Sequence, residues 1–95
     1  MNRAEIVLEV ALKTGLTQLE VSTVFEGVLE TVTEALSEGE PVELRGFGTF
    51  KCVSRSARNA VNPRTGEPIK VEAKIVPSFK PSPKLKNIVR GVKLK

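Results

Sequence analysis

Apolar residues recur every three or four positions over the first third of the chain, which is the spacing of amphipathic helices. Residues 3–13 form the first such segment, and Gly15 ends it. A second segment starts at the capping box Thr17–Glu20 and runs to about residue 37, before Gly39. The pattern therefore predicts two N-terminal helices.

The second predicted helix has a broad apolar face. Its members are Val21, Val24, Phe25, Val28, Leu29, Val32, Ala35 and Leu36. This face is wider than one short neighbouring helix can cover. We therefore expect a second subunit to cover the remainder, as in a symmetric dimer. A helix that is buried only within its own domain is the alternative.

After the second helix, apolar and polar positions alternate, which is the pattern of half-buried strands. Residues 42–45 predict a short strand, residues 49–54 a second strand and residues 69–76 a return strand. The glycines of residues 46–48 predict a tight turn between the first two. Pro77 marks an edge or a bulge in the sheet.

The segment between the second and return strands, residues 55–66, reads RSARNAVNPRTG and contains three arginines and no acid. Pro63 and the turn-forming pair Thr65–Gly66 predict a β-hairpin, with an arm of about residues 54–75. Nothing in the outer half of this hairpin can be buried, so we expect it to project from the body. A projecting basic ribbon suits an anionic partner. An ordinary solvated loop is the alternative.

Ser82 and Pro83 suit the N-cap and first position of a short C-terminal helix, and a basic tail, residues 91–95, follows. The elements together predict an α+β fold in a single domain, residues 1–95. Two N-terminal helices form its base, and a small antiparallel sheet carries the protruding β-ribbon arm. An arm of this length leaves a body near the size at which a lone core is marginal, which again predicts a dimer.

The charges divide the chain into an acidic half and a basic half. Residues 1–44 carry two cations and nine glutamates, whereas residues 45–95 carry thirteen cations and two glutamates. The first half therefore has a net charge of −7 and the second of +11. Such asymmetry points to nucleic acid or a membrane surface as the partner.

The missing residue types exclude most chemistry. The chain has no His and no Asp. Its single cysteine, Cys52, cannot form a disulfide within the chain and lacks a His to activate it as a nucleophile, so we expect it to fill a small apolar space in a strand. We predict no enzyme activity, no cofactor, no metal site and no small-molecule substrate. No apolar run reaches the ~20 residues of a membrane span, and no signal peptide pattern occurs, so we expect an intracellular, soluble chain without a membrane partner.

Two motifs, GFGTF at residues 46–50 and NPRTG at residues 62–66, resemble those of the bacterial histone-like HU and integration host factor family. The resemblance covers residues 1–90 in order. It implies an intertwined dimer whose paired arms bend, wrap and compact double-stranded DNA through the minor groove, with little sequence specificity, in the bacterial cytoplasm and nucleoid. The partner subunit is either an identical chain or a paralogue, and the sequence leaves both open.

The resemblance also implies roles for individual residues. In the arm, the residues expected to contact DNA are Arg55, Arg58, Asn62, Pro63 and Arg64, with Pro63 wedged between base pairs. In the body, the residues expected to meet phosphates are Lys80, Lys84 and Lys86. The dimer core is expected to contain Phe25, Val28, Leu29, Phe47, Phe50 and Phe79. A proline that only shapes the turn is the alternative for the wedge.

Two positions bear on the subtype. Ala60–Val61 stands where the family usually has Gly-Arg, so one arm cation is absent. Glu43 and Arg45, expected on one side of a strand, resemble a pair in the beta subunit of integration host factor that favours a DNA sequence. A sequence-favouring subunit is therefore the alternative function, and a plain surface ion pair is the alternative for Glu43 and Arg45.

Two other classes of protein fit the sequence less well. A single-stranded RNA binder would need exposed aromatic platforms, whereas the phenylalanines occupy core-like positions. A scaffold protein would not need so basic a half.

Overall fold

The computed structural model describes residues 1–56 and 58–94, with all of their side chains except those of Arg58 and Val71. The chain divides into two compact units, Met1–Ala35 and Leu36–Lys95. The single domain expected over residues 1–95 remains a prediction.

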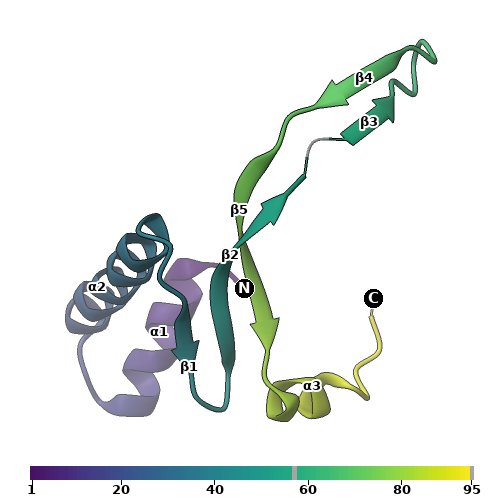
Figure 1. Cartoon of the computed structure of the whole chain (residues 1–95). Helices are drawn as coiled ribbons and strands as arrows, with labels where there is room; N and C mark the ends of the chain where they lie inside the picture. The colour runs from purple at the N-terminus through teal and green to yellow at the C-terminus, as the bar shows by residue number, and fades with distance from the viewer. Residues whose placement is uncertain (57, 95) are drawn as a thin grey trace. The chain divides into compact units, whose positions relative to one another are not determined.

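The first unit contains the two predicted helices, α1 (Arg3–Thr14) and most of α2 (Gln18–Ser37) (Figure 1). Asn2 caps α1 by accepting a hydrogen bond from the Glu5 N–H at 3.0 Å. Gly15 ends α1 in the left-handed conformation, at φ 78°. Both helix starts and stops were predicted because these capping signals are local in sequence.

The capping box at the start of α2 has its expected reciprocal hydrogen bonds. The Thr17 N–H donates to Glu20 Oε1 at 3.0 Å, and the Glu20 N–H donates to Thr17 Oγ1 at 3.1 Å. These contacts satisfy two backbone donors that the helix itself leaves without partners.

The core of the first unit is very small. Among the described residues of the whole chain, the buried apolar side chains are those of Val7, Ala11 and Val21, against which Phe25 is partly buried. No large side chain within the described ranges is fully buried. A single chain therefore shields little apolar surface from water.

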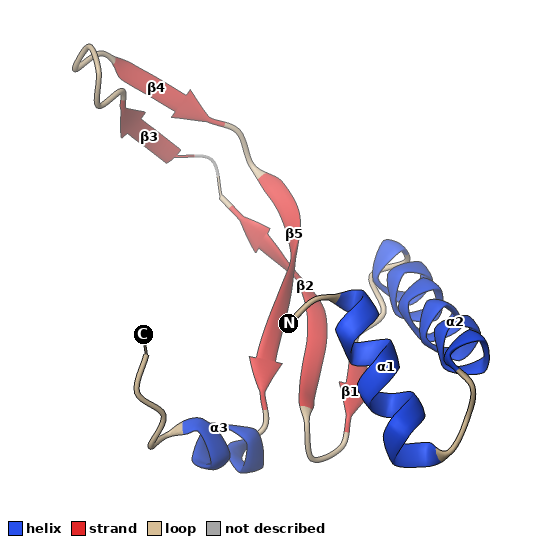
Figure 2. Ribbon diagram, turned by 180° about the vertical axis from the view of Figure 1, so that it is seen from behind, coloured by secondary structure: helices blue, strands red, loops and turns tan. Residues whose placement is uncertain are grey.

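The second unit contains two antiparallel sheets and a short helix. In the larger sheet the order is β1-β2-β5, and the smaller sheet pairs β3 with β4 (Figures 1 and 2). The elements are β1 (Val42–Leu44), β2 (Gly48–Arg55), β3 (Arg58–Val61), β4 (Pro68–Val71), β5 (Lys74–Pro81) and α3 (Pro83–Val89).

The prediction of one return strand over residues 69–76 was wrong. The structure forms β4 and β5 instead, with residues 72–73 in neither strand. Glu72 and Ala73 have low β propensity, although they fit the apolar–polar alternation. The predicted edge at Pro77 is confirmed: Pro77 pairs with Cys52 in an unbroken register, in a strand whose only partner in the described chain is β2.

The turn between β1 and β2 shows two different uses of glycine. Leu44 pairs with Gly48 across a three-residue turn, in which Gly46 has φ 80° and the Phe47 N–H donates to the Leu44 carbonyl at 2.9 Å. Gly48 is buried, and a Cβ there would lie 2.5 Å from the Phe79 ring. Gly46 is required by conformation and Gly48 by packing.

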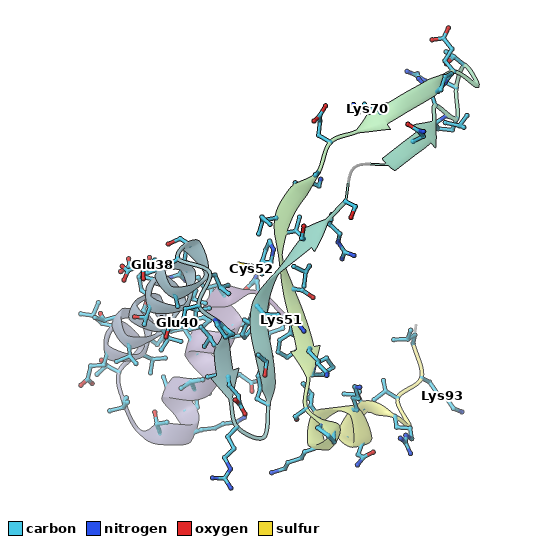
Figure 3. All side chains as sticks on the ribbon, in the orientation of Figure 1. Glu38, Glu40, Lys51, Cys52, Lys70 and Lys93 are labelled. Atoms are coloured by element: carbon cyan, nitrogen blue, oxygen red, sulfur yellow. The ribbon has the colours of Figure 1, made fainter. Side chains whose placement is uncertain are left out.

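Phe79 contacts two other phenylalanines of the second unit. The Phe79 ring centroid lies 4.7 Å from that of Phe50 and 5.5 Å from that of Phe47. Phe47 nevertheless remains 48% exposed. Cys52, labelled on β2 in Figure 3, is half-buried and donates from Sγ to the Leu36 carbonyl at 3.2 Å.

Candidate nucleic-acid interface

The arm is a two-stranded ribbon formed by β3 and β4, which extends from the β2–β5 end of the larger sheet (Figure 2). Along residues 58–71, the described side chains are exposed except for those of Ala60 and Asn62, which are half-buried. Each strand pairs only with the other in the described chain. The ribbon therefore presents both of its faces to solvent.

The register of the arm continues that of the larger sheet. Arg55 pairs with Lys74 at the end of the β2–β5 ladder, and Arg58 pairs with Val71 at the start of the β3–β4 ladder. The same number of residues separates the two ladders on each strand. Within each of the two ladders, successive side chains alternate between the two faces of the ribbon.

Asn62 organises the tip loop. Its backbone N–H donates to the Glu67 carbonyl, and its own carbonyl accepts from the Gly66 N–H, both at 2.8 Å. Its side-chain Oδ1 accepts from the Arg64 N–H at 2.9 Å. Gly66 has φ 74°, which few other residues adopt without strain. The predicted DNA-contact residue Asn62 thus shapes the loop that presents its neighbour Pro63.

Pro63 lies directly after Asn62, and its side chain is exposed at the tip. Proline lacks an N–H, and its fixed φ suits the early position of a turn. The ring therefore sits on an ordered loop and has no backbone donor to lose in an apolar environment. Both the predicted wedge and the alternative turn-forming role are compatible with this geometry.

The cations of the arm are solvent-exposed. Arg55 lies at the end of β2 and Arg64 in the tip loop, and neither guanidinium forms an ion pair within the described part of the chain. Arg58 begins β3, but its side chain lies outside the described ones. The structure adds two cations that the resemblance did not supply, Lys70 on β4 (Figure 3) and Lys74 on β5.

Arg55 and Lys74 are directly opposite each other in the antiparallel register. Directly opposed residues share a face of the ribbon, and like charges at such positions repel. Sequence reasoning missed Lys74 because its partner is known only once the hairpin register is known. The signal that could have identified it is the equal spacing of Arg55 and Lys74 from the centre of the tip.

A concavity of about 320 Å³ lies where the β1–β2 turn meets the junction of β5 and α3. Arg45 and Lys80 both line it. The Ser82 N–H donates to the Phe47 carbonyl at 2.9 Å, which joins the start of α3 to the turn. The structure thus brings two predicted site residues together, whereas Lys84 and Lys86 lie on α3 outside the lining.

The predicted strand over residues 42–45 was one residue too long. Strand β1 ends at Leu44, and Arg45 is the first residue of the turn. Strand alternation therefore does not place Glu43 and Arg45 on one side. Both residues line the concavity, but no ion pair joins them within the described ranges.

The described residues offer no other kind of site. They contain no cluster of three His, Cys, Asp or Glu side chains that could hold a metal ion. In the same part of the chain, the helices are too short or too polar to cross a membrane.

Comparison with known proteins agrees with this geometry. Residues 1–90 match the family model described as bacterial DNA-binding protein. DNA-binding protein HU of Lactococcus lactis is 46% identical over 89 residues, covering 94% of this chain and 98% of that protein. DNA-binding protein HU of Thermotoga maritima is 41% identical over 90 residues, covering 95% and 100%.

Among solved structures, the chain is similar to an Anabaena HU–DNA cocrystal structure, with a TM-score of 0.88 and 37% sequence identity. The similarity covers 97% of this chain and 100% of that one. Both kinds of comparison confirm the predicted resemblance. The chain belongs to the HU family of bacterial DNA-binding proteins.

Proposed function

We propose that this protein is an architectural double-stranded DNA-binding protein of the bacterial nucleoid, in the cytoplasm. It bends, wraps and compacts duplex DNA through arms in the minor groove, with little sequence specificity. Its affinity comes from neutralising phosphates, and its preference among sites comes from how easily the DNA deforms.

The observation that carries this proposal is the opposed pair of cations at the base of the arm. Arg55 and Lys74 repel each other in the free protein, which a structural role alone does not explain. A phosphate backbone lying across the ribbon removes the repulsion, because each cation then faces an anion. A bound polyanion thus makes this charge arrangement favourable.

Two copies of the chain are needed to complete the body. Apolar residues line a groove of about 280 Å³ on the first unit, and Val28 in this groove is 50% exposed. Leu29 and Phe79 are also substantially exposed, at 42% and 38%. Covering these side chains with a second, identical chain supplies the core that one chain lacks. Pairing with a paralogue would do the same.

We assign the roles at the interface as follows. Pro63 is the wedge, and Asn62 holds the loop that presents it. Arg55, Arg58 and Arg64 meet the DNA along the arm. Arg45 and Lys80 meet phosphates at the concavity, and Lys84 and Lys86 do so on α3.

The function is tested by titrating duplex DNA of arbitrary sequence at 50 and 200 mM salt, with energy transfer between end labels reporting the bend. If both subunits together neutralise about 6–10 phosphates, the affinity falls ~10³–10⁵-fold between the two salt concentrations. The end-to-end distance shortens on binding. Binding that is indifferent to salt, or that leaves the duplex straight, contradicts the proposal.

The wedge is tested separately with Pro63→Ala. Unstacking a base step costs a few kcal/mol, which the contacts of a bent duplex offset. We therefore expect the variant to bend linear DNA less but to keep most of its affinity for nicked DNA, which is already easy to kink. Equal weakening on both substrates, with an unchanged bend angle, would instead assign Pro63 to turn formation.

The sequence-favouring alternative has no comparable support. The relatives described above are named HU, and Glu43 forms no ion pair with Arg45 within the described chain. A single-stranded RNA binder would need aromatic rings that are free to stack on bases. The Phe79 ring instead packs against those of Phe47 and Phe50, and we assign the exposed parts of Phe47 and Phe79 to the dimer core.

A further inference from the structure

The outer end of the β3–β4 ribbon carries an apolar surface directly behind the tip loop. Two register pairs form it, Val61 with Pro68 and Ala60 with Ile69. Opposed residues share a face of the ribbon and successive residues alternate, so one pair lies on each face. These four residues are called the apolar collar below.

The collar is not part of a folding core. The Val61 side chain is 65% exposed and that of Ile69 is 43% exposed. Pairing across the ribbon therefore hides little of Val61, and β3 and β4 have no other strand beside them in the described chain. Water covers the collar in the free protein, so a partner that displaces this water gains stability.

Cations flank the collar along the ribbon, and none lies within it. Arg64 is in the tip loop, Lys70 follows the collar on β4, and the Arg55–Lys74 pair lies towards the body. A duplex has the same alternation, because charged phosphates flank the uncharged base edges on the floor of each groove. Cations held at the phosphates would thus bring the collar to the base edges.

We propose that the collar, through Val61, selects A·T base pairs beside the step that Pro63 enters. This inference rests on the proposed function, because it requires the arm to lie in the minor groove. There, A·T and G·C pairs both present acceptors, but only G·C adds a donor, the guanine N2 amino group. Val61 offers no acceptor, so a guanine beneath it keeps an unpaired and desolvated donor.

The test uses three duplexes of equal length, each nicked at the same central position so that the wedge site is shared. The base pairs flanking the nick are A·T, G·C or inosine·C, and inosine lacks the N2 amino group. We expect the G·C duplex to bind about tenfold more weakly than the A·T duplex, or ~1.4 kcal/mol. The inosine·C duplex should bind like the A·T duplex.

Two variants identify the residue. Val61→Thr keeps the side-chain shape and the strand propensity but adds a hydroxyl that can accept from the guanine amino group. The penalty for G·C should then fall to about twofold or less. The matched control is Ile75→Thr, because Ile75 is 67% exposed but lies on β5, outside the collar. The control should keep the full penalty.

The outcomes distinguish failure of the collar proposal from failure of the proposed function. Equal affinity of the wild-type protein for all three duplexes overturns the collar proposal, as does an inosine·C duplex that behaves like G·C. A full penalty in Val61→Thr, with unchanged thermal unfolding, also overturns it and leaves the collar as a surface for another protein. Failure of the wild-type protein to bind any of the duplexes contradicts the proposed function instead.

Discussion

Replacing Gly48 by alanine tests how closely strands β2 and β5 must pack. An added Cβ would lie 2.5 and 2.6 Å from two atoms of the Phe79 ring and 2.7 Å from the Lys80 carbonyl oxygen. The ring contacts those of Phe47 and Phe50, and the carbonyl belongs to a residue of the β2–β5 ladder, so relieving both contacts moves more than one side chain. The substitution must therefore displace β5 or open the aromatic cluster.

The expected loss of stability lies at the upper part of the range for overpacked sites, about 2–3 kcal/mol. For a chain of this size, each kcal/mol lowers the Tm by roughly 4–8 °C, so the decrease should be roughly 8–24 °C. Circular dichroism at a fixed chain concentration measures it, because the Tm of an associating chain depends on concentration. DNA affinity should fall as well, since Lys80 follows the displaced segment.

The matched control is Gly27→Ala. Apart from its chain neighbours and the backbone of its own helix, no described atom lies within 4 Å of a Cβ at Gly27, so alanine should stabilise α2 by about 0.5–1 kcal/mol. Opposite signs for the two variants support the packing argument. A Gly48→Ala protein that melts with the wild type would refute the claim that contact with Phe79 requires glycine.

Three further predictions concern association, the arm and the capping box. Val28→Asp should turn the dimer into monomers at micromolar concentration in sedimentation experiments, because a carboxylate in the shared core costs several kcal/mol; an intact dimer would contradict the assigned interface. Lys74→Ala should raise the stability of the free protein slightly, because it removes the repulsion with Arg55. It should also reduce the slope of DNA affinity against salt concentration by about one for each lysine that meets a phosphate. An unchanged slope would show that Lys74 does not contact the DNA. The pKa of Glu20 lies below its ordinary value of 4.5, chiefly because the Thr17 backbone N–H donates a hydrogen bond to the carboxylate. A hydrogen bond with the Thr17 side chain lowers the pKa further. The ionised form therefore stabilises the fold above pH 4.5 and loses this effect as the pH falls through the lowered pKa. The Tm difference between wild type and Glu20→Gln should accordingly shrink in that acidic range, and a difference that does not change with pH would contradict it.

The features that the sequence predicted well are those with local causes. The caps Asn2 and Gly15 and the capping box at Thr17 define the helices through residues at most four positions apart. The tip was predicted for a similar reason, because Asn62 and Gly66 close it within a few residues.

The features that the sequence did not predict depend on pairing across strands. Alternation continues through Glu72, so nothing in the pattern separates β4 from β5. Arg45 fits a strand until the three-residue turn excludes it. The opposed charges of Arg55 and Lys74 become visible only with the register. The DNA-contacting roles of individual side chains were inferred from resemblance, and they remain predictions.

Because the strand register is the same in the larger sheet and in the arm, the number of paired residues determines the length of the arm. Inserting a residue into one strand alone would turn every more distal side chain on that strand to the opposite face. The arm can therefore change length only by matched insertions in both strands. Each residue of an antiparallel strand spans about 3.4 Å, so two added residues on each side would move Pro63 by about 7 Å. Under the proposed function, the number of paired residues in the ribbon thus sets how far from the body Pro63 meets the DNA.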